Sequence, residues 1–369
     1  MLIEIFFISL SVLYFFTHIF LYLGFKKSLG LTKSRNSSFP KVSVIVAGRN
    51  EAQNIVRCVE SLAKTDYPKE FLEIILVNDN STDNTLELMK ESTKEFDFFK
   101  VINSKKSISG NLKGKANAIN TAIKISTGDI IISTDADCQV PLNWINETVR
   151  YYNKKTPMVC GFTMIKFKES LFAKVQCIDW MYLLSLASSS AGLKMILSCL
   201  GNNLSFTKKS YIETGGYESI GFSVTEDLAL MRKIDSIKTY DIKFPVDKEC
   251  LVETQPCKNL RELFSQKRRW FRGGIGINFL GYIIGFQLYS MNFLIVFGLF
   301  FLNFKLFIAL IIIKIISELI LISKTFQRFN LKELYKYYPL FILYFAFYGL
   351  TLPFTFIFHT KIKWKEQKF

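Results

Sequence analysis

Hydrophobic positions along the chain fall into long apolar runs and short ones. The long runs have about the 20 residues that cross a bilayer, and they cover residues 2–25, 275–302, 306–322 and 338–358. Between residues 40 and 257, short apolar runs alternate with polar turns and with segments whose apolar residues recur at helical spacing. The pattern predicts a central domain with membrane helices on both sides of it in the sequence.

The short apolar runs are rich in β-branched residues, as are strands buried on both faces of a parallel sheet. We expect strands at residues 42–47, 73–77, 100–103, 130–134 and 158–164. A helical face follows the first strand (Ala52, Ile55, Val59 and Leu62) and a polar, cap-rich turn follows the second. Repeated strand, polar turn and helix predict an α/β fold with a doubly wound, mostly parallel sheet.

The first long run, residues 1–25, is interrupted only by Glu4 and His18. A cleaved signal peptide would have a basic region before the apolar run and a small-residue cleavage site after it, and the sequence has neither. We therefore expect a retained anchor. Basic residues follow it (Lys26, Lys27, Lys33 and Arg35), which predicts an integral protein of the inner membrane with the next domain in the cytoplasm.

Residues 258–274 have the pattern of an amphipathic interfacial helix. The apolar side chains lie on one side and mostly basic ones on the other; the apolar ones are Leu260, Leu263, Phe264 and Phe271. The preceding residues 40–257 would form the cytosolic catalytic domain. An apolar, serine-rich helical region at residues 171–197 is expected inside it, against the membrane surface.

Residues 275–360 are expected to form about three membrane helices. With one anchor before them, three spans place the basic tail at residues 361–368 outside, against the positive-inside tendency. If residues 275–302 are re-entrant, the basic loop at residues 324–336 lies outside instead. The charge rule leaves both topologies open.

The formal net charge of +16 does not indicate nucleic acid binding. The basic residues cluster beside the apolar runs and around residues 258–272, and no spacing typical of an RNA- or DNA-binding module is present. Anionic lipid headgroups explain the charge better, so we expect membrane lipids and no nucleic acid among the partners.

Cysteine and histidine usage narrows the chemistry. The seven cysteines form an odd set without a C-x-x-C pair, which favours reduced thiols in a cytosolic domain. The two histidines, His18 and His359, lie in or beside the membrane segments. Histidine zinc sites and Ser-His or Cys-His machinery are therefore excluded as first choices, and acid–base chemistry falls to carboxylates.

Two aspartates, Asp135 and Asp137, end the apolar run that starts at residue 130, and Pro141 prevents the strand from continuing. Side chains two apart on extended backbone point to the same side, and the carboxyl end of a parallel strand faces the ligand crevice. Two adjacent carboxylates favour a hard divalent cation such as Mg²⁺ or Mn²⁺, which phosphate oxygens would complete. An ordinary acidic turn is the alternative.

Three further positions are candidates. Asp79 follows the second strand, where a carboxylate could accept a hydrogen bond from a ribose or a base, or simply close a turn. Lys115 stands at a predicted helix start, where it could meet phosphate oxygens. Asp227 and its neighbour Glu226 precede another helix, whose dipole favours their ionised form; a helix cap is the plain alternative.

The motifs occur together and in order over most of residues 40–270. They are V-N-D-N-S-T-D at residues 77–83, Gly114-Lys115-Ala116, Asp135-Ala136-Asp137, Thr225-Glu226-Asp227 and Q-x-x-R-W at residues 266–270. In this order they resemble the membrane-bound family 2 glycosyltransferases, which include cellulose, chitin and hyaluronan synthases and ceramide glucosyltransferase. Asn78 and Asn80 depart from the Asp and Gly of the family pattern.

The resemblance implies a GT-A fold, Rossmann-like with a mixed, mostly parallel sheet, and a nucleotide-diphosphate sugar donor, most often UDP-linked. By position, Asp79 would contact the base and Lys115 the diphosphate. Asp135 would contact the ribose or the metal, and Asp137 would ligate Mg²⁺ or Mn²⁺.

The same resemblance implies the remaining roles. Asp227 would be the general base that deprotonates the acceptor hydroxyl, and Gln266 and Arg269 would hold the diphosphate. Trp270 would form a platform for the acceptor sugar or lipid headgroup.

Three functions are compared. Transfer of one sugar to a lipid or lipid-linked acceptor is favoured, because about four spans give little helix to line a channel. A processive polysaccharide synthase is the alternative, and a partner subunit could complete its channel. A non-catalytic nucleotide-binding scaffold is disfavoured by the intact set of Asp137, Asp227 and Arg269.

Overall fold

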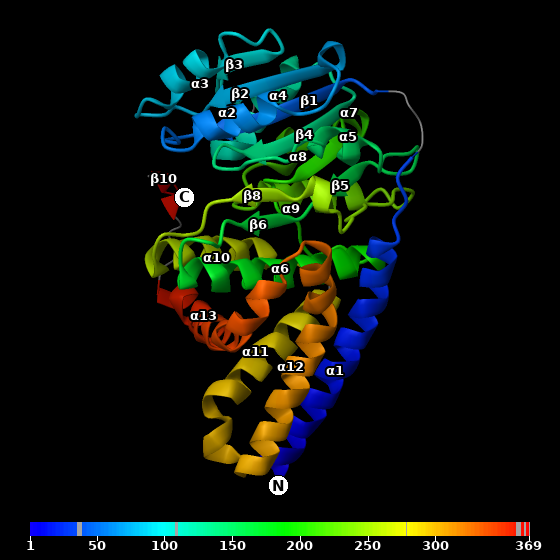
Figure 1. Cartoon of the computed structure of the whole chain (residues 1–369), viewed down its shortest axis with the longest axis vertical. Helices are drawn as coiled ribbons and strands as arrows, with labels where there is room; N and C mark the ends of the chain where they lie inside the picture. Colours follow the sequence, from blue (N-terminus) through cyan, green and yellow to red (C-terminus); the bar gives the residue numbers. More distant parts are fainter. Residues whose placement is uncertain (35–38, 108–109, 278, 359–362, 365–366, 369) are drawn as a thin grey trace. The chain divides into compact units, whose positions relative to one another are not determined.

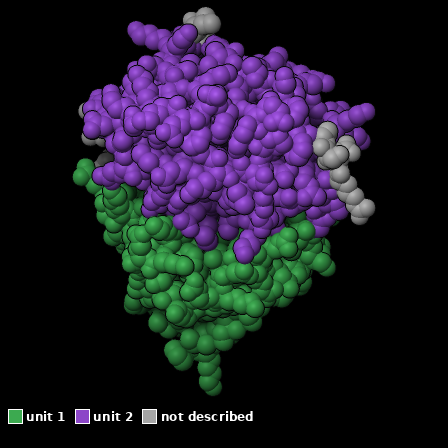
Figure 2. Space-filling view, turned by 45° about the horizontal axis from the view of Figure 1, so that its top comes forward, with its two compact units in different colours: residues 1–29, 165–197, 256–369 green, residues 30–164, 198–255 purple. Residues whose placement is uncertain are grey.

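A computed structural model describes residues 1–34, 39–107, 110–277, 279–358, 363–364 and 367–368. Arg35, His359 and residues 361–362 and 365–366 of the basic tail lie outside the described residues. The chain divides into two compact units, which Figure 2 distinguishes by colour. Unit 1 contains residues 1–29, 165–197 and 256–369, and unit 2 contains residues 30–164 and 198–255.

Unit 2 is built on a sheet that has, among the described residues, six strands in the order β3-β2-β1-β4-β7-β5 (Figure 1). They are β1 (Val42–Gly48), β2 (Leu72–Asn78), β3 (Phe99–Asn103), β4 (Ile130–Asp135), β5 (Met158–Cys160) and β7 (Leu204–Thr207). The first four run parallel, and β7 is antiparallel to both β4 and β5. The predicted α/β fold with a mixed, mostly parallel sheet is confirmed.

The helices of unit 2 are short. They are α2 (Ile55–Ala63), α3 (Thr85–Thr93), α4 (Gly114–Ile125), α5 (Trp144–Val149), α7 (Lys208–Glu213), α8 (Gly216–Ile220) and α9 (Glu226–Asp235). Single 3₁₀ turns are η1 (Lys69–Phe71) and η2 (Lys248–Cys250).

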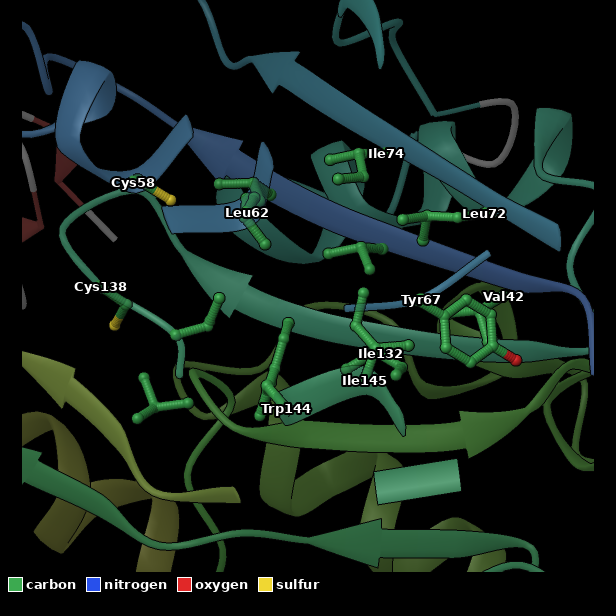
Figure 3. Close-up of a cluster of buried hydrophobic side chains, with 14 of the residues drawn as sticks. Val42, Cys58, Leu62, Tyr67, Leu72, Ile74, Ile132, Cys138, Trp144 and Ile145 are labelled. Carbon is green, nitrogen blue, oxygen red and sulfur yellow. The ribbon is translucent and has the colours of Figure 1, made fainter. Parts of the chain in front are cut away.

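The core of unit 2 explains why its strands are apolar throughout. Alternate strand residues such as Val42, Ile74 and Ile132 pack with Leu62 and Trp144 in one buried cluster (Figure 3). The intervening strand residues are buried as well, because helices cover both faces of the sheet. A continuous apolar run, and not an alternating one, is therefore the sequence pattern of these strands.

The structure differs from the prediction at residues 158–164. Two strands replace one: β5 ends at Cys160 and β6 (Thr163–Ile165) begins after Gly161, pairing with β8 (Val252–Thr254) in a small second sheet. At the break, the Gly161 N–H donates to the carbonyl of Asn203 at 2.8 Å, and a Cβ at position 161 would lie 2.3 Å from the Asn203 side chain. The antiparallel strand β7 was not predicted either.

Unit 1 is helical. Its helices are α1 (Leu2–Leu29), α6 (Leu171–Gly192), α10 (Leu260–Gly274), α11 (Phe279–Phe301), α12 (Phe304–Arg328) and α13 (Tyr338–Phe358), with η3 (Lys332–Tyr337). Two antiparallel strands of two residues each, β9 (Lys363–Trp364) and β10 (Gln367–Lys368), also belong to it. In the described part of the chain, four helices are long and apolar enough to cross a membrane: Leu2–Leu29, Phe279–Phe301, Phe304–Arg328 and Lys332–Phe354. Helix α6 forms as expected.

Helix α12 carries a charged pair inside its apolar sequence. Lys314 and Glu318 are one helical turn apart, form an ion pair, and are 1% and 0% exposed. Tyr14 of α1 and Tyr338 donate hydrogen bonds to the two Glu318 oxygens at 2.7 and 2.6 Å. Each acceptor atom of the buried carboxylate therefore has a partner, which is what burial in an apolar bundle requires.

Candidate active site

The carboxyl ends of the parallel strands bring candidate residues to one edge of the sheet. In the register, Gly48 of β1 pairs with Asn78 of β2, and Ala47 pairs with Asp135 of β4. Asp79 follows β2 directly, so it and Asp135 lie at the same edge of unit 2. This is the edge at which open α/β sheets bind ligands.

Asp79 is held by backbone and by a serine. Its N–H donates to the carbonyl of Gly48 at 2.8 Å, and its Oδ1 accepts a hydrogen bond from Ser104 Oγ at 2.8 Å. The residue is 3% exposed, and its Oδ2 is buried without a hydrogen-bond partner among the described residues. An orphaned buried carboxylate oxygen is costly and is a ready acceptor for a ligand N–H or O–H.

The two asparagines beside Asp79 depart from the family pattern, and each has a structural role in the turn after β2. Asn80 has φ +54°, the left-handed conformation that Gly adopts freely and that Asn tolerates best among other residues. Asn78 accepts from the N–H of Ser81 and donates to Asn103 Oδ1. Both residues shape the turn after β2, and Asp79 itself matches the family pattern.

Lys115 lies among carboxylates. It stands in the first turn of α4, and its Nζ is 2.6 Å from Asp135 Oδ1 and 3.3 Å from Glu226 Oε1. Burial lowers the pKa of Lys115, but the charges of Asp135, Glu226 and Asp227 more than offset this, so its pKa is raised. The lysine is therefore a permanent cation shared by groups from β4 and α9.

Asp227 lies in the first turn of α9 and has both oxygens engaged. Oδ1 accepts from the N–H of Leu228 at 2.8 Å and Oδ2 from the N–H of Gly201 at 2.6 Å. Burial and the neighbouring Glu226 nevertheless raise its pKa to about 6, against the opposing effects of Lys115 and the two N–H groups. We expected the helix dipole to favour the ionised form of Asp227. Burial and the like charge of Glu226 outweigh that effect on its pKa.

Gly201 lies close to both charged side chains. A Cβ at position 201 would lie 3.2 Å from Asp227 Oδ2 and 3.2 Å from Lys115 Nζ. The backbone at this glycine therefore lies against Asp227, whose Oδ2 accepts its N–H. Sequence reasoning also missed Glu226 as a partner of Lys115, although the acidic pair at residues 226–227 was its visible signal.

Asp137 lies in the turn after β4 and is half-buried, with the Cys138 thiol 3.6 Å from its Oδ1. Among the residues that the structure describes, no cluster of three or more His, Cys, Asp or Glu side chains is placed to hold a metal ion. In proteins, Mg²⁺ is usually bound by only one or two carboxylates, and substrate phosphates supply further oxygen ligands. Asp135 and Asp137 fit this pattern.

The remaining candidates belong to unit 1. Gln266, Arg269 and Trp270 lie along α10, which the sequence predicted as an amphipathic helix. Leu263 is buried, whereas Leu260 and Phe271 are exposed. Gln266 Oε1 is buried without a partner among the described residues. The structure thus groups Lys115, Asp135 and Asp227 in unit 2, and Gln266, Arg269 and Trp270 on one helix of unit 1.

Two family models match the sequence. Glycosyl transferase family 2 matches residues 43–212, and Glycosyl transferase family group 2 matches residues 130–358. The two matches together include each residue that the motifs singled out.

Curated relatives include enzymes of polysaccharide and of glycolipid synthesis. A poly-beta-1,6-N-acetyl-D-glucosamine synthase of Staphylococcus epidermidis is 28% identical over 68% of this chain and 58% of the relative. A beta-monoglucosyldiacylglycerol synthase of Nostoc sp. is 27% identical over 66% of this chain and 50% of the relative. The chain thus spans only half to three fifths of the length of these relatives.

Among solved structures, a mannosyltransferase from Pyrobaculum calidifontis, in complex with GDP-Man and Mn²⁺, has a similar fold. The TM-score is 0.57 at 20% identity, and the likeness covers 73% of this chain and 74% of that one. At this identity the likeness is evidence for the GT-A fold alone.

Proposed function

The chain belongs to Glycosyl transferase family group 2, and on that premise we propose that it is a membrane-bound, metal-dependent, inverting hexosyltransferase. It moves a sugar from a nucleotide-diphosphate sugar, UDP-linked in the first instance, to a hydroxyl of a lipid or lipid-linked acceptor. One observation carries the proposal: Lys115 lies 2.6 Å from Asp135 and 3.3 Å from Glu226, beside the Asp227 base. Lys115, which would stabilise the leaving group, and Asp227, which would deprotonate the acceptor, then belong to one cluster.

Donor binding uses the edge of the sheet in unit 2. The orphaned Asp79 Oδ2 accepts a hydrogen bond from the nucleobase, which gives a buried oxygen the partner it lacks among the described residues. Lys115 donates from Nζ to the diphosphate, and the start of α4 adds its positive dipole end. Asp135 contacts the ribose or the cation.

Asp137 and Asp135 would hold the Mg²⁺ or Mn²⁺ of this proposal. Such an ion neutralises charge on the diphosphate and makes it a better leaving group. The position of the two carboxylates, at the end of β4 and two residues further on, supports this assignment.

Asp227 is the general base. The acceptor oxygen forms a bond to the anomeric carbon from the side opposite the nucleotide, the bond from that carbon to the diphosphate oxygen breaks, and the acceptor proton passes to Asp227. A pKa of about 6 leaves the carboxylate ionised at neutral pH but more basic than an exposed Asp. Lys115, with Arg269 and Gln266, takes the negative charge that develops on the diphosphate.

The acceptor is presented at the membrane. We assign Trp270 to it as a platform for a sugar or lipid headgroup, and α10 to the interface between lipid and cytosol. Residues 1–25 serve as the anchor, residues 40–257 as the cytosolic catalytic domain, residues 258–274 as the interfacial helix and residues 275–360 as further spans, in the inner membrane.

A processive polysaccharide synthase is the second candidate, since a relative of this chain is named as such a synthase. It would need more helix around a channel than the four candidate spans of the described residues provide. A partner subunit could supply it.

The test is product analysis with the purified full chain, Mn²⁺, native membrane lipid and a panel of labelled nucleotide sugars. A labelled product that extracts with lipid supports the first candidate, and label in polymer supports the second. If no labelled sugar of the panel is transferred or released, the proposed function is wrong.

A further inference from the structure

The helix that carries Q-x-x-R-W is fixed by a buried charge inside the motif. Lys267, the first variable position, is 3% exposed, although the remaining basic residues of α10 are not buried. It forms an ion pair with Asp179 of α6, which is 0% exposed. A lysine on the inner face of an amphipathic helix contradicts the pattern that predicted basic residues on the outer face.

Asp179 joins three helices of unit 1. Its Oδ2 pairs with Lys267 of α10, and its Oδ1 accepts a hydrogen bond from the Tyr348 hydroxyl of α13 at 2.7 Å. Both oxygens of the buried carboxylate are thus used. Such a pair holds only one arrangement of α6, α10 and α13, because any other would leave a charge buried without a partner.

The lysine also contacts the tryptophan of the motif. Lys267 Nζ lies 4.5 Å from the centroid of the Trp270 ring and 4.9 Å from that of Tyr348. The Trp270 ring packs on Trp180 of α6 with centroids 5.4 Å apart at an angle of 56°. The indole is therefore fixed by an ammonium group over its ring and by a second indole beside it.

We propose that Asp179 and Lys267, with Tyr348, are positioning residues that orient the Trp270 indole for the acceptor and thereby set the affinity for the acceptor. The inference deepens the proposed function and rests on the role given there to Trp270. It adds a specificity element that the Q-x-x-R-W motif does not contain: Lys267 and its partner Asp179.

The experiment compares two buried pairs of the same chemistry. The test variant is Lys267→Met/Asp179→Asn, which removes both charges together and so leaves no buried charge unpaired. The matched control is Lys314→Met/Glu318→Gln, because that pair is equally buried in unit 1 and contacts no residue of the motif in any interaction described above. Lys267→Arg tests rescue, since arginine also forms cation–π contacts.

The kinetic measurements are kcat and the KM values for the acceptor and the donor. The fluorescence emission of Trp270 is obtained by subtracting the spectrum of the same variant that also carries Trp270→Phe. We expect the test variant to raise the acceptor KM about 30-fold, the size of one desolvated cation–π contact, with the donor KM within about twofold. Its Trp270 emission should shift, and Lys267→Arg should recover most of both changes.

The proposal is overturned if the test variant keeps the wild-type acceptor KM and Trp270 emission, or if the control variant changes both by as much. The emission measurement needs no turnover. If the wild-type chain transfers no sugar, the proposed function fails by itself, and an unchanged Trp270 emission would still overturn the positioning inference.

Discussion

The two units treat buried charge in opposite ways. In unit 2, one lysine, Lys115, faces carboxylates from Asp135, Glu226 and Asp227, so negative charge is in excess. Burial, together with the charge of Glu226, raises the pKa of Asp227 to about 6. In unit 1, each buried lysine has one carboxylate: Lys267 with Asp179 and Lys314 with Glu318. Tyrosine hydroxyls fill the remaining acceptor positions of the unit 1 pairs.

The difference indicates two uses of buried charge: the unit 2 cluster is suited to binding and proton transfer, and the unit 1 pairs are suited to helix packing. An unbalanced cluster costs stability and persists where a ligand or a proton is to be received. A balanced pair is satisfied by the fold itself and fixes how helices pack. Substitutions in the cluster around Lys115 should therefore reduce activity, and breaking the Lys314–Glu318 pair should reduce stability.

Asp227→Asn should have the largest effect. The amide cannot accept the acceptor proton, so we expect kcat to fall about 10²–10⁴-fold, the range for a positioned general base. Donor affinity, measured by titration calorimetry, should stay close to wild type because the residues that we assign to the donor, Asp79 and Lys115 among them, are unchanged. Asp235→Asn, at the other end of α9, is the matched control and should keep full activity. Wild-type turnover in Asp227→Asn would remove it from the mechanism.

Lys314→Met tests the other side of the comparison. It leaves Glu318 charged and buried, so thermal unfolding in detergent should show a loss of about 3–5 kcal/mol. Lys314→Met/Glu318→Gln removes both charges and should recover most of that stability. If the single variant unfolds like wild type, the pair does not hold the bundle together.

These two regions also differ in how far the sequence predicts them. The strand ends could be predicted from the sequence, because β-branched runs stop at Asp79 and at Asp135. Parallel strands then bring their carboxyl ends to one edge of the sheet. The confirmed fold follows from that pattern. The partners of Lys115 could not be predicted, because they depend on how tertiary packing brings the start of α9 beside the start of α4, and no local spacing encodes that.

In unit 1 the sequence shows less. The spacing of Lys314 and Glu318 by four residues was visible, but the pair lay inside an apolar run that was interpreted only as a span. Lys267 and Asp179 are 88 residues apart, so only tertiary packing unites them. Strand β7 escaped prediction because four residues give too short a run to show a period.

Asp79→Ala should weaken donor binding without affecting the fold of unit 2. The lost acceptor is worth about 1.5–3 kcal/mol for a hydrogen bond to a charged group, or roughly 10- to 100-fold in affinity. Calorimetry with the nucleotide diphosphate measures this directly. Asp97→Ala, an exposed carboxylate before β3, should bind like wild type. Equal affinities in both variants would contradict the role of Asp79.

The pH profile of the wild-type enzyme tests the raised pKa. Since the base must be unprotonated, kcat/KM should fall about tenfold per pH unit below a pH of about 6, and not below about 4 as for an ordinary Asp. The folded state binds this proton more tightly than the unfolded chain, so the group favours folding at low pH and this contribution is lost as pH rises through about 6. Loss of activity there is therefore not unfolding caused by Asp227. A flat profile between pH 5 and 7 would argue against Asp227 as the base.

The smallest expected effect concerns Asn80, where the sequence departs from the family pattern. Its φ of +54° is free for Gly and strained for Ala, so Asn80→Ala should lose about 1 kcal/mol of unfolding free energy. Asn80→Gly relieves the backbone but loses the side-chain hydrogen bond to Ser104, which is 3.2 Å away, so it should stay within about 0.5 kcal/mol of wild type. Denaturant unfolding of the full chain in detergent measures both. If Asn80→Ala is as stable as Asn80→Gly, the asparagine is kept for something other than backbone conformation, and its amide beside Asp79 becomes the place to look.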